Sequence, residues 1–164
     1  MIDFSLIKII PADNSHYEFL FKAKKEAYGY IIERVWGDWD EKIQREFFAE
    51  DWQKLKPSVI LNDTQPIGSY CCTKNKDNYF LERFYILPEY QNKGIGTLVL
   101  KRILEAADKD QLPVKLMYLD FNPAATLYER LGFEVTGRQE IKGKQECFVM
   151  TERKPSLDNK GNKS

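Results

Sequence analysis

The segment from Tyr79 to Thr97 constrains the fold more than any other part of this sequence. Residues 79–87 are rich in aromatic and aliphatic side chains, as in a buried strand, and Pro88 ends that strand. A loop with glycines at positions 94 and 96 follows, and a strongly helical segment begins near Gly94. Because this order directs free backbone N–H groups and the positive end of a helix dipole at one spot, it predicts an anion-binding site.

Two familiar nucleotide-binding motifs are excluded by single residues in this segment. A dinucleotide-binding fingerprint requires a third glycine at position 99, where the chain has Val99. A P-loop requires Gly-Lys-Ser/Thr, but Gly96 is followed by Thr97. Taken alone, the two glycines are therefore equally compatible with an anion site and with an ordinary glycine turn before a helix.

The rest of the chain predicts strands and helices in the order β-α-α-β-β-β-α-β-α-β-β. The apolar periodicity predicts helices over residues 14–35, 39–53, 95–107 and 123–131. The second of these is expected to begin with a capping box at Asp38. Strands are expected over residues 4–10, 57–61, 67–73, 79–87, 114–119, 133–140 and 146–151. Hairpins in the middle and helical crossovers later imply an α/β (α+β) fold with a mixed, mostly antiparallel twisted sheet of about seven strands and helices on both faces.

Composition excludes several classes of protein. Lys plus Arg and Asp plus Glu number 25 each, so the basic excess of a nucleic-acid binder is missing. The only histidine is His16, which excludes a multi-histidine centre, and no metal is expected. No stretch approaches ~18 consecutive apolar residues, and the N-terminus lacks the basic region of a signal peptide, so no membrane association is expected.

The cysteines and the chain length indicate a single cytoplasmic domain. Cys71, Cys72 and Cys147 are odd in number and form neither a CxxC motif nor a disulfide framework, which favours reduced thiols. A chain of 164 residues can bury a sufficient core without disulfides. We expect one domain over residues 1–153 and a polar C-terminal tail over residues 154–164.

Two motifs resemble one known family. The pattern Gln91-x-x-Gly94-x-Gly96, directly after a strand ending in Ile86-Leu87-Pro88, resembles the acetyl-CoA signature of the GNAT superfamily of N-acetyltransferases. Residues 122–133 resemble that family's Asn-x-x-Ala-x-x-Leu-Tyr-x-x-x-Gly-Phe stretch. The expected element order also matches the GNAT fold over roughly residues 4–152, whereas residues 12–56 carry no widely shared motif.

The resemblance implies acetyl-CoA as co-substrate, with contacts at specific residues. The backbone groups of Ile86 and Leu87 are expected to hold the pantetheine arm as an added strand would. Asn122 is expected to contact the pantetheine, and Tyr128 to lie near the sulfur. The backbone amides expected to bind the pyrophosphate are those of Gln91, Asn92, Lys93, Gly94, Ile95, Gly96 and Thr97.

Acyl transfer from a thioester to an amine needs a base, an oxyanion donor and a proton for the leaving thiolate. Tyr128 is the candidate acid, because a phenol with an ordinary pKa of about 10 is protonated at neutral pH; the alternative is a tyrosine that packs the short helix on the sheet. Glu82 is the candidate base, and the alternative is an exposed strand residue paired with Arg83 or a lysine. The Ile86 amide is expected to stabilise the oxyanion.

The acceptor is the least constrained part of the hypothesis. Residues 28–52 are dense in aromatic and acidic side chains, and residues 36–39 (Trp-Gly-Asp-Trp) are one candidate for an amine pocket. The other interpretation is a helix pair that buries its aromatic face and leaves its acids capping or solvated. We predict acetyl transfer to a primary amine of a small molecule or a protein. The alternative is a non-catalytic acyl-CoA sensor of the same fold, and C-terminal edge strands can pair two copies into a homodimer.

Overall fold

The computed structural model describes residues 1–156, and its chain divides into two compact units that are described separately here. The first unit comprises Met1–Cys72 and Glu82–Gly96, and the second comprises Thr73–Leu81 and Thr97–Ser164. Residues 157–164, most of the expected polar tail, lie outside the described residues. The assignment of residues 1–153 to a single domain stays a prediction.

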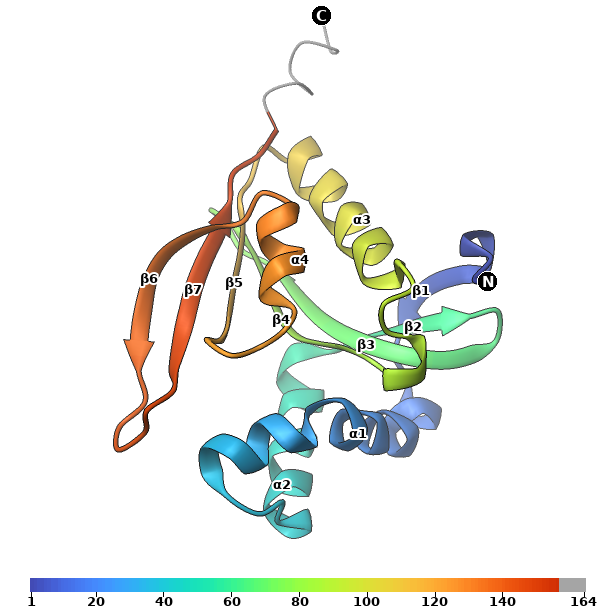
Figure 1. Ribbon diagram of the computed structural model, residues 1–164. Helices are drawn as coiled ribbons and strands as arrows, with labels where there is room; N and C mark the ends of the chain where they lie inside the picture. Colours follow the sequence, from blue (N-terminus) through green and yellow to red (C-terminus); the bar gives the residue numbers. More distant parts are fainter. Residues whose placement is uncertain (157–164) are drawn as a thin grey trace, which may run out of the picture. The chain divides into compact units, whose positions relative to one another are not determined.

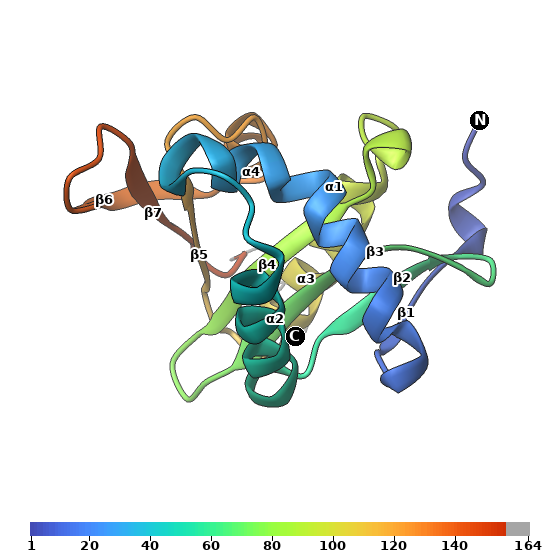
Figure 2. The same ribbon diagram turned by 90° about the horizontal axis from the view of Figure 1, so that it is seen from below.

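The first unit places two helices on a sheet. Its strands are β1 (Ile7–Pro11), β2 (Ser58–Asn62), β3 (Gln65–Lys74) and β4 (Tyr79–Ile86), of which β3 and β4 extend into the second unit. Its helical elements are η1 (Phe4–Leu6), η2 (Asn14–His16), α1 (Tyr17–Trp36), α2 (Glu41–Leu55) and η3 (Pro88–Tyr90). Figure 2 shows α1 and α2 lying over β2 and β3. The buried cluster between these elements consists of Leu20, Phe21, Phe48, Val59 and Leu61.

The second unit combines two helices with a hairpin. Its elements are α3 (Ile95–Lys109, which begins in the first unit), β5 (Val114–Leu119), α4 (Ala125–Arg130), β6 (Glu134–Glu140) and β7 (Cys147–Arg153). The ring of Tyr128 on α4 stacks on Tyr118 of β5 with centroids 5.5 Å apart. Figure 1 shows β6, β7 and β5 side by side, in agreement with their pairing.

The strand order is β1-β2-β3-β4-β5-β7-β6, in one seven-stranded sheet. β1 pairs with β2, β2 with β3, β5 with β7, and β6 with β7, all antiparallel, whereas β4 pairs with β5 in parallel. The expected mixed, mostly antiparallel sheet is confirmed. Within residues 1–156, no helix has both the length and the apolar character needed to cross a membrane.

Two expected boundaries are wrong for local electrostatic reasons. Residues 4–6 form a 3₁₀ turn instead of the start of a strand, because the Asp3 carboxylate accepts hydrogen bonds from the Ser5 amide at 3.0 Å and the Ser5 hydroxyl at 2.6 Å. Asp40, not Asp38, caps α2, since its carboxylate accepts from the Ile43 amide at 3.0 Å. In both places the boundary is set by an acidic side chain, which accepts a hydrogen bond from a backbone N–H two or three residues later that has no partner within the helix.

Candidate active site

Where β4 ends, one backbone N–H bonds to β3, and the N–H of the residue before it points away from β3. The Leu87 N–H donates to the Ile67 carbonyl of β3 at 2.9 Å, so Leu87 faces its neighbouring strand. The Ile86 carbonyl accepts from the Gln91 side-chain amide at 2.8 Å. Because successive residues of a strand direct their backbone groups to opposite edges, the Ile86 N–H points away from β3. Of the two residues expected to hold pantetheine, Ile86 therefore keeps a donor outside the sheet, whereas the Leu87 donor is used within it.

The loop after β4 has the geometry of an anion site. Gln91 donates its N–H to the Pro88 carbonyl at 3.1 Å, so this amide is already used. Asn92 and Gly94 have φ of +60° and +86°, which turns the chain into the helix that follows. The amides of residues 95 and 96 begin α3 and have no acceptor within the helix. These amides at the positive end of a 15-residue helix fit a pyrophosphate.

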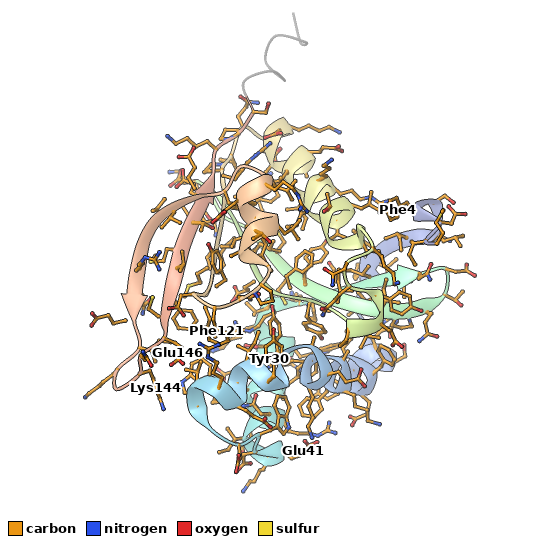
Figure 3. All side chains as sticks on the ribbon, in the orientation of Figure 1. Phe4, Tyr30, Glu41, Phe121, Lys144 and Glu146 are labelled. Atoms are coloured by element: carbon orange, nitrogen blue, oxygen red, sulfur yellow. The ribbon has the colours of Figure 1, made fainter. Side chains whose placement is uncertain are left out.

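Gly94 also meets the N-terminal segment. A Cβ built on Gly94 would lie 3.0 Å from Cζ of Phe4, which belongs to η1 and is marked in Figure 3. A positive φ and a close neighbour thus both favour glycine at this position. Local sequence does not report the contact with Phe4, which lies 90 residues away along the chain.

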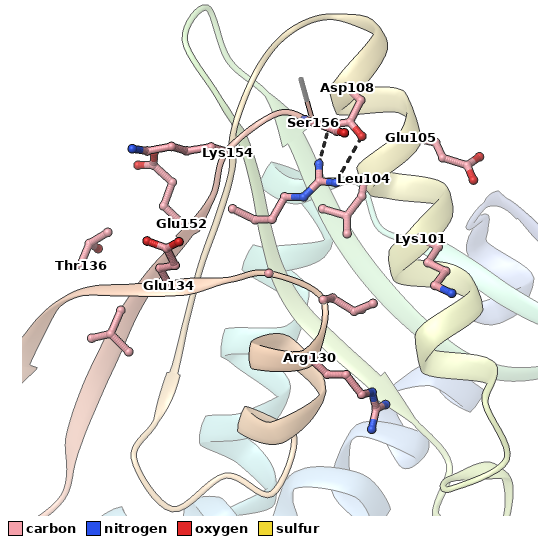
Figure 4. A pocket seen from close by; sticks show the side chains of 14 residues that line it. Lys101, Leu104, Glu105, Asp108, Arg130, Glu134, Thr136, Glu152, Lys154 and Ser156 are labelled. Atoms are coloured by element: carbon pink, nitrogen blue, oxygen red, sulfur yellow. Dashed lines mark hydrogen bonds and ion pairs between the residues drawn. The ribbon is translucent and has the colours of Figure 1, made fainter. Parts of the chain in front are cut away.

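In the second unit, the first turn of α3 is linked to α4. Arg130 Nη2 approaches the Thr97 hydroxyl at 3.4 Å. Arg130 and Lys101 line an open groove of about 720 Å³, drawn in Figure 4. Asp108 also lines the groove, and its buried carboxylate accepts hydrogen bonds from the Arg153 guanidinium and from the Ser156 amide, the latter at 2.9 Å. Arg130 adds a positive charge beside the first turn of α3. Its position two residues after Tyr128 is the one feature of the sequence that could have pointed to it.

Asn122 and Tyr128 shape α4. The Asn122 amide oxygen accepts from the Ala124 N–H at 2.9 Å, so it turns the chain into the helix and leaves its NH₂ group as a possible donor. Tyr128 is 6% exposed and packs between Tyr118 and Phe133. Burial, followed by the charge of Tyr118, raises the pKa of Tyr128 to about 12. The phenol is thus protonated at neutral pH, as a proton donor requires.

Glu82 lies beside the guanidinium of Arg83, as expected if it is a strand residue paired with that arginine. Its carboxylate is 3.6 Å from Nη1 of Arg83, and its side chain is 23% exposed. Arg83 in turn pairs with Asp51 of α2 at 2.8 Å. Glu82 is thus neither a fully solvated strand residue nor a core residue, and its position is compatible with the proton acceptor expected of it.

The predicted site residues divide between the two units. Glu82, Ile86, Leu87 and residues 91–96 belong to the first unit, and Thr97, Asn122 and Tyr128 belong to the second. Within the first unit, one continuous segment brings the β4 donors and the anion loop together. Within the second unit, α4 carries Tyr128 two residues before Arg130, the residue that approaches Thr97.

The residues suggested for an acceptor pocket are mainly structural. Trp39 packs against Phe21 with ring centroids 6.0 Å apart, and its indole N–H donates to Glu41 at 2.9 Å. Asp40 is the cap of α2. Trp36 and Asp38 are exposed around Gly37, whose φ of +94° ends α1. The geometry therefore favours the interpretation in which a helix pair buries its aromatic face.

The three cysteines are free, and two of them are poorly suited to act as nucleophiles. Burial, followed by the charge of Glu82, raises the pKa of Cys71 to about 12, and burial raises that of Cys72 to about 11. A thiol with such a pKa holds its proton near neutral pH. Among residues 1–156, no group of three or more His, Cys, Asp and Glu side chains is arranged to hold a metal ion.

The seven-stranded mixed sheet and the helix start that follows β4 agree with the expected GNAT fold. The model of the acetyltransferase (GNAT) domain matches residues 53–135, just over half of the chain. The chain belongs to the GNAT acetyltransferase family. The expected membership of the GNAT superfamily is confirmed.

Individual relatives agree with this assignment. A bovine (Bos taurus) thialysine N-ε-acetyltransferase is 41% identical over 66 residues, which are 39% of this chain and only 38% of that protein. The structure of PaiA N-acetyltransferase from Thermoplasma acidophilum in complex with coenzyme A has a TM-score of 0.67, at 20% identity over 90% of this chain and 98% of that one. A chimeric spermidine N-acetyltransferase from Vibrio cholerae has a TM-score of 0.69, at 18% identity over 91% and 95% of the two chains. The last two similarities concern the fold alone.

Proposed function

We propose that this protein transfers an acetyl group from acetyl-CoA to a primary amine of a small molecule or a protein, by direct attack of the amine on the thioester. The observation that carries the proposal is Tyr128, which occupies the tyrosine position of the family motif and lies buried on α4. The three free cysteines, two with raised pKa values, favour direct attack and a place in the cytoplasm.

Each step is assigned to a group of the chain. The amides of residues 92–97 hold the pyrophosphate, and the Ile86 N–H donates to the acyl oxygen as negative charge develops on it. Glu82 accepts the proton of the attacking amine, directly or through water. As the new C–N bond forms and the C–S bond breaks, the Tyr128 hydroxyl gives its proton to the leaving thiolate and regains one from solvent.

The test of the activity is release of free thiol from acetyl-CoA in the presence of single amines. The panel contains thialysine, lysine and spermidine, because relatives are named for thialysine and spermidine, together with a peptide bearing a free N-terminus. We expect thiol release that depends on at least one amine, with a mass increase of that amine by one acetyl group. If the protein binds acetyl-CoA but acetylates no amine across such panels, the sensor function replaces this proposal.

Arg130 is expected to contribute to cofactor binding by charge. It approaches Thr97 at the start of α3, so Arg130→Ala should weaken acetyl-CoA binding several-fold and make the affinity less sensitive to salt. Calorimetric titration at two ionic strengths measures both effects. Arg138→Ala, on β6, serves as the control for loss of one positive charge elsewhere in the unit. An equal weakening by both substitutions would assign the effect to net charge.

A further inference from the structure

Arg83 has an unusual backbone conformation for its place in the fold. It lies inside β4 with φ of +56°, in the left-handed region, whereas Lys56, Asp63 and Gln111 have positive φ outside strands. Such a conformation in a non-glycine residue persists where the surrounding structure holds it, and it is concentrated at functional sites. The residue that precedes Arg83 is the candidate base Glu82.

The guanidinium of Arg83 bridges two carboxylates from different elements. Its Nε is 2.8 Å from Oδ2 of Asp51 on α2, which is a direct charge-assisted hydrogen bond. Its Nη1 is 3.6 Å from Oε1 of Glu82 on β4, which is too long for a good hydrogen bond but short for a charge interaction. Asp51 therefore fixes the side chain, and the remaining part of the guanidinium faces Glu82.

The other titratable groups of this region come from the elements packed around β4. Lys24 of α1 and Cys71 of β3 line a cavity of about 20 Å³ together with Asp51 and Arg83, large enough for about one water. Burial lowers the pKa of Lys24, with the charge of Asp51 opposing that effect and the charge of Arg83 adding to it. Among the ion pairs of the described residues, the cation that pairs with Glu82 is Arg83.

We propose that Arg83, held in place by Asp51, is a positioning residue that keeps the Glu82 carboxylate oriented toward the proton of the attacking amine. This inference rests on the proposed acetyl transfer and on Glu82 as its base. The guanidinium lies 3.6 Å from the Glu82 carboxylate and restrains its direction by charge, and the bond to Asp51 at 2.8 Å restrains the guanidinium itself.

A different role for Arg83 would be to anchor a carboxylate of the acceptor. The geometry does not favour this role, because the guanidinium already faces two carboxylates. A third anion would have to displace one of them. The two roles differ in what they predict, since an anchor acts on the KM of carboxylate-bearing acceptors alone.

The experiment compares Arg83→Gln, Glu82→Gln and the double variant in steady-state acetylation at saturating acetyl-CoA. Arg83→Gln should lower kcat about tenfold and leave the acceptor KM nearly unchanged, because a base that is no longer held toward the amine is misplaced for the reaction. In the Glu82→Gln background the same substitution should cause no further loss. Arg83→Lys should restore part of the rate, since it keeps the charge but cannot span both carboxylates.

The controls separate this positioning role from folding. Arg45→Gln removes another ion-paired arginine, which bonds Glu18 with Nη1 at 2.8 Å, and it should leave kcat unchanged. Thermal unfolding and the acetyl-CoA Kd of each variant report folding. If Arg83→Gln does not fold, the proposal is decided by Arg83→Lys, which must show a smaller loss of kcat than the one expected for Arg83→Gln.

Three results would overturn the inference. The first is an unchanged kcat in a folded Arg83→Gln variant, and the second is a loss from Arg83→Gln that is equally large without Glu82. The third is a rise in acceptor KM restricted to amines that carry a carboxylate, which would make Arg83 an anchor. If Glu82→Gln keeps the wild-type rate, the base assignment and this inference fail together while acetyl transfer stands. If the wild type acetylates nothing, the proposed function itself fails.

Discussion

Tyr128→Phe should lower kcat by ~10²- to ~10⁴-fold, the range in which a positioned general acid contributes. The substitution removes one hydroxyl and keeps the ring, which is packed 5.5 Å from Tyr118 and 5.8 Å from Phe133 between centroids. The fold and the phosphate loop should therefore be unaffected, and the Kd of acetyl-CoA should barely change. Single-turnover acetylation and calorimetric titration of acetyl-CoA measure the two quantities separately.

The matched control is Tyr118→Phe, which removes a hydroxyl from the other ring of the same stack. It should leave kcat nearly unchanged. Equal losses from both substitutions would mean that the ring stack, and not the acid, supports the rate. An unchanged rate in Tyr128→Phe would remove the observation on which the proposed function rests.

The same residue predicts the alkaline side of the pH–rate profile. Because burial raises the pKa of Tyr128 to about 12, the phenol keeps its proton through neutral and moderately alkaline pH and loses it only near that value. The acid is therefore present at every pH where the enzyme is expected to work. A loss of wild-type rate well below this value that disappears in Tyr128→Phe would contradict the assignment.

Much of the fold follows from local sequence signals. The strand over residues 114–119 was expected with the boundaries that β5 has, because Pro113 directly precedes it. The start of β1 was missed, since the Asp3 cap competes with a strand that β-branched residues favour. Apolar periodicity fixes the type of an element, whereas a single side-chain hydrogen bond sets where it begins.

The start of α3 was predictable because the residues around it follow one another in the chain. Residues 91–97 form one run, so the helix start could be read from the glycines and the strand before them. The left-handed Arg83 and its bond to Asp51, 32 positions earlier, depend on how α2 packs, which no local pattern reports. Arg130 meets Thr97 33 positions earlier for the same reason. Contacts of this separation require the folded chain.

Gly94→Ala should weaken acetyl-CoA binding by about tenfold or more, because a left-handed conformation costs an alanine roughly 1–2 kcal/mol and each 1.4 kcal/mol is about tenfold in affinity. Gly94 has φ of +86°, and the new Cβ would also lie 3.0 Å from Cζ of Phe4. The loop must then shift, and the shift moves the amides of residues 92–96 away from the positions that fit a pyrophosphate. Calorimetric titration with acetyl-CoA and thermal unfolding give the affinity and the stability of the variant.

Two further variants separate the causes. Phe4→Ala combined with Gly94→Ala removes the close contact but leaves the strained φ, so it should recover only part of the affinity. Gly143→Ala in the β6–β7 turn is the matched control, because Gly143 has φ of +75° with nothing within 4 Å of a new Cβ. It should lower stability without changing the Kd of acetyl-CoA. An equal loss of affinity in Gly143→Ala would show that general destabilisation, and not the geometry of the loop, limits cofactor binding, and the anion site at the start of α3 would lose its support.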